Sequence, residues 1–189
     1  MELNGGQLLQ LIVIFTIYCQ LTTAKHIAVW QFFGNCKESE SNSLFHFENS
    51  HWGMVTPEIS ELNTTFVLMQ DMDIVTSKVS AYKCKSDKES DCEIMMTVPV
   101  NDVCSRLREK NQLYSIFTEA MHPPMPCPFK KGSYPVVRAR INLNVVQSLM
   151  EENTIYLLKF PGDYHGKSTG CMMVKAKKIS VKTKRKNRK

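Results

Sequence analysis

The sequence predicts an all-β domain: a sandwich, barrel or cup of antiparallel strands that disulfide bonds hold together. Three observations predict this fold class. Several segments alternate apolar and polar residues, Gly and Pro residues separate them, and six cysteines follow an apolar N-terminal leader. Evenly spaced strands with turns between them are typical of sandwiches and barrels. An even number of cysteines in an exported chain is typical of disulfides.

Length and composition fit one globular domain. The chain has 189 residues, of which 43% are apolar and 22% charged, and this excludes the disordered, collagen-like and coiled-coil classes. The net charge of +6 is carried entirely by residues 182–189, which contain six basic residues and no acid. Because the rest of the chain is neutral, we expect a disordered basic tail and no nucleic-acid partner.

The N-terminus has the pattern of a secretion signal. Residues 8–19 form an apolar run with one Gln, too short to span a bilayer and of the right length for a signal-peptide core. We therefore expect a signal peptide over residues 1–24, a folded domain over residues 25–181, and a secreted, extracellular protein. Glu2, with no basic residue before the run, departs from the usual signal. A membrane anchor and a buried strand are the alternatives.

The cysteines and one glycosylation sequon agree with export. Cys19 leaves with the signal, and six cysteines remain: Cys36, Cys84, Cys92, Cys104, Cys127 and Cys171. They predict three disulfides, and spacing alone leaves 15 connectivities open. No C-x-x-C pair or finger spacing is present, so we expect no structural zinc. Asn63 begins the sequon Asn-Thr-Thr and is the predicted glycosylation site.

Seven segments have the pattern of strands. They are residues 27–33, 66–74, 79–83, 94–98, 134–146, 156–160 and 171–181. The clearest is 134–146, where five apolar residues alternate with Arg and Asn: Val137, Ala139, Ile141, Leu143 and Val145. A strict period of two predicts one buried face and one solvated face.

Other segments give less complete patterns. In 66–74, four residues share the predicted buried face: Phe66, Leu68, Met72 and Ile74. We expect the strand over 156–160 to end at Pro161-Gly162, and residues 163–165 to form a hairpin turn. Glu48 and His51, beside Trp52, are expected in a loop.

One short helical segment interrupts the strands. Asn101 or Asp102 can cap it, and apolar residues follow at helical spacing: Val103, Leu107, Leu113, Ile116, Phe117 and Ala120. The Pro-rich residues 122–128 must form a loop, which we expect Cys127 to anchor.

No pattern of residues indicates catalysis. The five histidines lack metal-binding spacing, and the sequence contains no nucleophile elbow, phosphate-binding glycine loop or dinucleotide fingerprint. We therefore expect no enzyme, no metal and no cofactor. Ten methionines remain after signal removal. They suit either ordinary core packing or an apolar surface that adapts to varied ligands.

One motif resembles a known family. Residues 126–134 (PCPFKKGSY) resemble the C-P-F-K-x-G-x-Y signature of the ganglioside activator family, the lysosomal proteins that present sphingolipids. The order of the cysteines is also similar: a short Cys84–Cys92 loop, Cys104 at the head of a helix, and a Gly-Cys strand at Cys171. The resemblance covers residues 30–180. The activator family has two further cysteines between Cys104 and Cys127, and this chain lacks both.

The whole chain is more similar to an insect branch of that superfamily, the chemosensory protein B (CheB) family, which is related to the ML lipid-recognition proteins. Its members are small secreted proteins of taste sensilla that are implicated in pheromone responses. Three features carry this resemblance: the signal, the single sequon in an N-T-T-F-V-L strand, and the missing fourth disulfide.

The resemblance implies a disulfide pairing and a cavity. The pairs are Cys36–Cys171, Cys84–Cys92 and Cys104–Cys127, and the fold is an antiparallel β-cup whose apolar cavity receives acyl chains. We expect the inward-facing rows of the predicted strands to line this cavity and bind the lipid: Phe66, Leu68, Met72, Met96, Val137, Ile141, Leu143, Leu158 and Met172. Leu113, Ile116 and Phe117 of the helical segment are expected at its rim.

The resulting functional hypothesis is a secreted, non-enzymatic carrier of lipid, fatty-acid or cuticular-hydrocarbon-like ligands in gustatory or pheromone chemosensation, with a receptor or channel at a sensory membrane as partner. Two alternatives stay open. One is a lipid-presenting activator of a hydrolase or a lipid-sensing defence protein. The other is a secreted β-domain that binds only another protein.

Overall fold

The computed structural model describes residues 25–39, 43–112, 114–148 and 150–181. The predicted signal peptide (1–24), the basic tail (182–189) and Leu113 lie outside these residues. Within the described part, residues 27–179 belong to one unit. His26 and Ser180 belong to a second unit, in which His26 Nδ1 and Ser180 Oγ are 3.1 Å apart.

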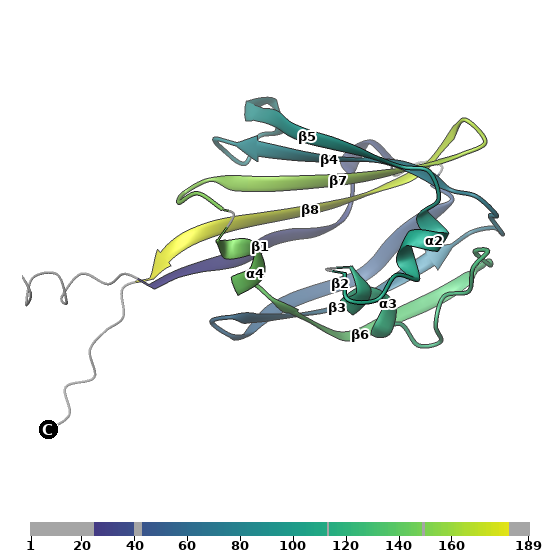
Figure 1. The fold of residues 1–189 in the computed structure, drawn as a ribbon, viewed down its shortest axis with the longest axis horizontal. Coiled ribbons are helices and arrows are strands. Elements are labelled where there is room, and N and C mark those ends of the chain that lie inside the picture. Colours follow the sequence, from purple (N-terminus) through teal and green to yellow (C-terminus); the bar gives the residue numbers. More distant parts are fainter. Residues whose placement is uncertain (1–24, 40–42, 113, 149, 182–189) are drawn as a thin grey trace, which may run out of the picture. The chain divides into compact units, whose positions relative to one another are not determined.

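The described residues form two β-sheets, and the all-β prediction is confirmed (Figure 1). The first sheet has the order β1 (Lys25–Asn35), β8 (Lys167–Val181), β7 (Ile155–Tyr164), β4 (Thr76–Cys84) and β5 (Cys92–Val100). The second has the order β2 (Phe45–Thr56), β3 (Ile59–Leu68) and β6 (Gly132–Asn142). The β2–β3, β3–β6, β4–β5, β4–β7 and β7–β8 pairs are antiparallel.

Short helices lie between strands, and the single predicted helical segment is in fact two helices. They are α2 (Val103–Leu107) and α3 (Ser115–Glu119), which link β5 to β6; α4 (Asn144–Gln147) links β6 to β7. Two 3₁₀ helices, η1 (Lys37–Ser39) and η2 (Glu89–Asp91), complete the described elements. Asp102 caps α2, because its Oδ1 accepts a hydrogen bond of 3.1 Å from the Ser105 N–H.

Several predictions need correction, beginning with the end of β7 and a predicted loop that is part of β2. Strand β7 continues through Pro161 and Gly162 to Tyr164, and the hairpin turn is His165-Gly166, with φ of 53° and 76°. Strand β2 contains Glu48, His51 and Trp52, which the sequence placed in a loop. Its pattern is hidden because the register shifts between Glu48 and His51, so no period of two persists along it.

The predicted alternation in residues 134–146 also fails at its two ends. Val136 is 2% exposed, whereas Val137 is 50% exposed, because Arg138 has a φ of 54° and the β3–β6 register shifts beside it. Strand β6 ends at Asn142, and Val145 is exposed on α4.

The predicted strand over 66–74 is also too long, because β3 ends at Leu68. Met72 is buried in an isolated bridge to Phe129, and Ile74 is exposed. The shared face predicted for these residues therefore does not extend past the end of β3.

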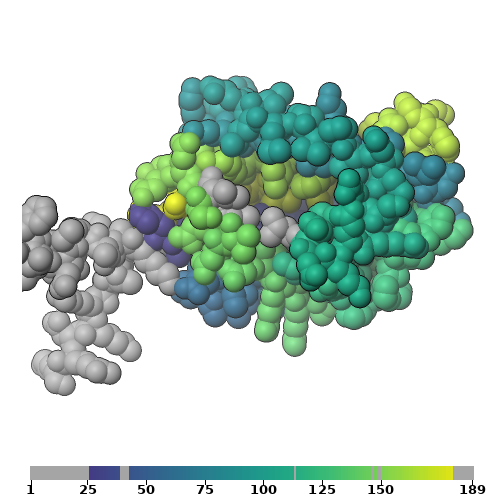
Figure 2. All heavy atoms as spheres, viewed as in Figure 1, coloured from purple at the N-terminus to yellow at the C-terminus, as the bar shows by residue number. Residues whose placement is uncertain are grey.

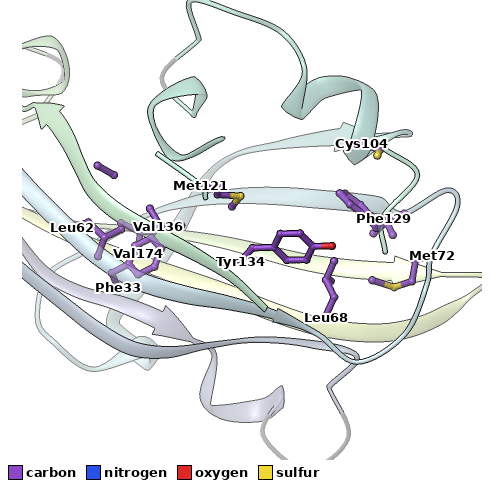
Figure 3. Close-up of a cluster of buried hydrophobic side chains, with 12 residues drawn as sticks. Phe33, Leu62, Leu68, Met72, Cys104, Met121, Phe129, Tyr134, Val136 and Val174 are labelled. Carbon is purple, nitrogen blue, oxygen red and sulfur yellow. The ribbon is translucent and has the colours of Figure 1, made fainter. Parts of the chain in front are cut away.

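Most of the core lies between the sheets. Figure 3 shows the cluster that joins them, in which Phe33 and Val174 of the first sheet lie close to Leu62 and Val136 of the second. This central cluster consists of Phe33, Leu62, Leu68, Met72, Val75, Cys104, Met121, Phe129, Tyr134, Val136, Ala139 and Val174. A lateral cluster consists of Ala28, Ile141, Leu143, Met150 and Ala176. An outer cluster consists of Cys36, Cys84, Ile155, Leu157 and Met173. It includes two half-cystines and lies on the other face of the first sheet.

Three disulfides are present, as predicted. They are Cys36–Cys171, Cys84–Cys92 and Cys104–Cys127, the pairing that the family resemblance implies, with sequence separations of 135, 8 and 23 residues. The first fastens the end of β1 to β8. The third fastens α2 to the Pro-rich loop before β6.

Candidate functional site

The inner face of the first sheet is incompletely covered. Leu158 of β7 pairs with Val174 of the central cluster, so Leu158 faces the second sheet. Its neighbour Leu157 faces the outer cluster and is only 1% exposed. Leu158 and Tyr156 are half-buried although β7 is an interior strand of the sheet. The inner face of this strand is therefore less protected than its outer face.

Exposure of the inner face increases toward β5. Ala81 of β4 pairs with Leu158 on one side and with Met96 on the other, and Val79 pairs with Val98. Met96 and Val98 therefore share the inner face with Leu158, yet they are 56% and 43% exposed. The cause is geometric: five strands face only three, so the second sheet cannot cover the whole of the first.

Two more apolar residues are exposed on β5. Ile94 pairs with Tyr82, and Met95 is the extra residue at the register shift beside it. This strand ends the order of its sheet, so its second edge has no described partner strand. A run of exposed apolar side chains on an edge strand is rare without a binding role or protection from aggregation.

Figure 2 shows a hollow beside β5. We call this opening the mouth: its upper side is formed by β4 and β5, its right side by α2 and α3, and its left side by the region of α4. The yellow-green chain of β7 and β8 is visible at its floor. The mouth therefore leads to the inner face on which Leu158 and Met96 lie.

Aromatic side chains fill the part of the interior near α3. The Phe117 ring stacks on Phe33 with centroids 5.8 Å apart, and Phe33 meets Phe47 edge-on at 5.2 Å. Phe66 lies 5.0 Å from Phe47 and 5.5 Å from Phe45. Because Ile116 and Phe117 pack against both the central and the lateral cluster, α3 forms a wall of the interior.

A small polar network lies between β4, β7 and the segment after α4. Lys83 Nζ is 2.6 Å from Glu151 Oε2, and the Glu151 N–H donates to Tyr156 Oη at 3.0 Å. The hydrogen bond to Glu151 raises the pKa of Lys83. Lys83 pairs with Tyr156, which packs against the lateral cluster, so both residues lie on the inner face.

The C-P-F-K-K-G-S-Y segment has a structural role. Phe129 is buried in the central cluster, and Tyr134 Oη donates a 2.7 Å hydrogen bond to the Lys130 carbonyl. Asp71 accepts from Lys130 Nζ at 2.9 Å and from the Lys131 N–H at 2.8 Å, and these bonds lower its pKa. The segment fixes the start of β6 and contributes no described side chain to the exposed surface of β5.

The predicted lipid-binding residues occupy different environments. Leu68, Met72 and Leu143 are fully buried by protein atoms, and Ile141 lies in the lateral cluster. Five others are half-buried and pack against the central cluster: Phe66, Ile116, Phe117, Leu158 and Met172. Met96 is exposed on the inner face of β5, and Val137 lies at the irregularity of β6.

The sequence prediction missed several residues of the site. Val98 lies on the inner face of β5 beside Met96, but it was not assigned to the site, because a period of two predicts which face a residue lies on and not whether that face is covered. Ile94 pairs with Tyr82, which packs against the outer cluster, so Ile94 lies on the opposite face. Tyr156 belongs to the same inner row as Leu158, and that alternation was visible in the sequence. Trp30 packs against both interior clusters, and its isolated position in a short apolar segment gave no signal.

Asn63, the predicted glycosylation site, lies on β3 between the buried residues Leu62 and Thr64. Alternation along the strand places it on the outer face, and its Oδ1 accepts a 2.9 Å hydrogen bond from the Arg138 N–H. Across the described residues, no group of His, Cys, Asp and Glu could hold a metal ion. No helix of the described part is long and apolar enough to cross a membrane.

Comparison of the sequence with protein-family profiles and with curated proteins finds no match. Among solved structures, the chain is similar to chicken MD-1 in its crystal structure complexed with lipid IVa, with a TM-score of 0.35 and 11% sequence identity. The match covers 79% of this chain and 98% of MD-1.

Proposed function

We propose that this chain is a secreted, non-enzymatic protein that binds an apolar ligand between its two sheets. The observation that carries the proposal is the exposure of Met96 and Val98 on the inner face of β5, beside the mouth. A lipid, fatty-acid or hydrocarbon chain that enters the mouth would cover these side chains. It would extend along the half-buried inner row of β7.

The energy for such binding comes from burial alone. Removing one CH₂ from water is worth about 0.8 kcal/mol, so a chain of ten methylenes gains roughly 8 kcal/mol before the costs of association. Methionine suits this surface because its flexible thioether adapts to different apolar shapes. Specificity for chain length and shape is then loose, as expected for a carrier.

The finer role that we propose is chemosensory transport to a receptor or channel at a sensory membrane. Its support is the resemblance to the CheB family, which rests on the signal, the single sequon and the missing fourth disulfide. A carrier of this kind should extract its ligand from vesicles without another protein. A hydrolase activator would instead change the turnover of a partner enzyme.

Binding of another protein is the second candidate, and the apolar edge of β5 favours it. An unpaired edge strand can add a strand from a partner. A protein partner would bind along the backbone of β5, whereas an apolar ligand would bind the inner face. Native mass spectrometry of the secreted protein separates the two, because a small ligand adds a mass of a few hundred daltons.

Met96→Glu tests the proposed site. We expect the variant to fold normally, since the position is exposed, and to lose uptake of a fluorescent fatty acid by at least tenfold, because a carboxylate is costly to desolvate. Met69→Glu is the matched control: Met69 is 48% exposed and lies after β3, beside Leu44. Equal uptake by both variants would contradict the proposed site.

A further inference from the structure

Trp30 of β1 carries a buried hydrogen-bond donor. Its side chain packs against both the central and the lateral cluster, so it lies between the sheets. Its Nε1 is inaccessible to solvent and has no hydrogen-bond partner among the described residues. Buried indole N–H groups usually have a partner, because an unpaired donor has lost its bond to water without replacement.

The surroundings of Trp30 are apolar and include small residues. Ala28 stands two residues earlier on the same strand, and Ala176 of β8 belongs to the same lateral cluster. Ile116 and Phe117 of α3 are the other residues that pack against both clusters, and α3 forms one side of the mouth. The indole therefore lies at the junction of the two clusters. The helix α3, which forms one side of the mouth, packs against the same two clusters.

A second buried polar atom gives a useful contrast. Thr169 Oγ1 also has no described partner, but Thr169 is fully buried and tightly enclosed. A Cβ at Gly162 would lie closer to Thr169 Oγ1 than any real contact, and Phe45 is adjacent. This position offers no room for a ligand atom. Trp30 differs in that its side chain as a whole is only partly buried, although its Nε1 is inaccessible to solvent.

We infer that Trp30 Nε1 donates a hydrogen bond to an oxygen of the ligand. The ligand class is then an apolar chain that bears a carbonyl, as in a ketone or an ester, and not a plain alkane. This inference rests on the proposed function, because it requires that a chain enter between the sheets. Trp30 then makes the protein bind chains that carry a carbonyl more tightly than unsubstituted alkanes.

The expected preference is about tenfold. A hydrogen bond that satisfies a buried donor changes an equilibrium by roughly this factor, because both the bond and the relief of the unpaired group contribute. An alkane of equal length fills the same space but leaves the indole N–H unpaired. Chain length therefore determines the overall affinity, and the carbonyl determines the preference for a ketone over an alkane of equal length.

Two probes of equal length test this: 2-heptadecanone and heptadecane, each competing with a fluorescent fatty acid on the full mature chain. We expect the ketone to bind about tenfold more tightly than the alkane to the wild type, and equally tightly to Trp30→Phe. Phe keeps the apolar surface and removes only the donor. Trp52→Phe is the control and should keep the preference, since Trp52 lies on β2 and is exposed.

A direct measurement does not depend on the folding of the variant. The chain has two tryptophans, so the wild type gives two indole N–H signals in a ¹⁵N–¹H NMR spectrum. The Trp30 signal should move when the ketone binds and move less with the alkane, while the Trp52 signal serves as an internal reference.

Two results would overturn the inference while leaving the proposed function intact. They are equal binding of both probes to the wild type, and a ketone preference that persists in Trp30→Phe. If neither probe nor the fluorescent fatty acid binds, the proposed function itself is wrong, and the inference falls with it.

Discussion

The Phe117 ring of α3 stacks on the Phe33 ring of β1, with an interplanar angle of 21° and centroids 5.8 Å apart. Phe33 belongs to an edge strand of the first sheet, whereas Phe117 comes from the connection between β5 and β6. This contact therefore ties the wall of the mouth to the opposite side of the first sheet. It also fills space that a ligand could otherwise occupy.

Phe117→Ala should weaken this wall. Full burial of a Phe side chain is worth 3–5 kcal/mol against Ala, and Phe117 is half-buried, so we expect a loss of about 2 kcal/mol in the free energy of unfolding. The space left should also admit bulkier alkyl probes. Thermal unfolding and a series of probes of increasing width measure both effects. Val145→Ala, at an exposed residue of α4, should change neither.

The three disulfides should differ in their contribution to stability. In the chain-entropy relation, a loop of 135 residues is worth about 5 kcal/mol and a loop of 8 about 2.5 kcal/mol. We therefore expect the double variant Cys36→Ser/Cys171→Ser to unfold at much lower denaturant than Cys84→Ser/Cys92→Ser. The reverse order would show that the outer cluster, to which both bonds contribute, depends more on the short hairpin.

Gly170→Ala should destabilise the domain. Gly170 has a φ of 143°, and a Cβ there would lie 2.6 Å from the Phe45 carbonyl oxygen, so the close approach of β8 to the start of β2 requires a residue without a side chain. We expect a loss of about 2 kcal/mol, a decrease of roughly 4–8 °C in Tm. Gly53→Ala is the control, because a Cβ at Gly53 meets no atom within 4 Å.

The ion pair on the outer face of the first sheet predicts a loss of stability in acid. Lys159 Nζ is 2.6 Å from Glu89 Oε2, and this hydrogen bond lowers the pKa of Glu89. A carboxyl whose folded pKa is lowered contributes stability above its unfolded pKa, about 4.3, and that contribution disappears as the pH falls through the folded value.

Glu89→Gln tests this dependence. The variant should be less stable than the wild type by about 1 kcal/mol at pH 7, and the difference should vanish at low pH. Glu93→Gln provides the matched control, because the Lys85–Glu93 pair is exposed and screened by water. A constant difference between Glu89→Gln and the wild type from pH 7 to pH 2 would contradict the assigned cause.

Much of the fold could be predicted from local pattern. Alternation located seven of the eight described strands at least in part, missing only β2, and placed Leu158 and Met172 on the same inner face. The cap at Asp102, the turn near His165 and the number of disulfides also follow from residues close together in the sequence. These features depend on local geometry and on the number of cysteines, and both can be read directly from the amino-acid sequence.

The sequence alone also determined that Met96 faces inward, but only the tertiary structure decided that it is uncovered. Facing follows from the period of two within a strand. Cover depends on how many strands the opposite sheet contains, and here three strands face five. Two other properties also depend on the tertiary structure, each for its own reason. The exposure of Val137 follows from the irregularity at Arg138, and the N–H of Trp30 is unpaired because of the neighbours that the fold places around it.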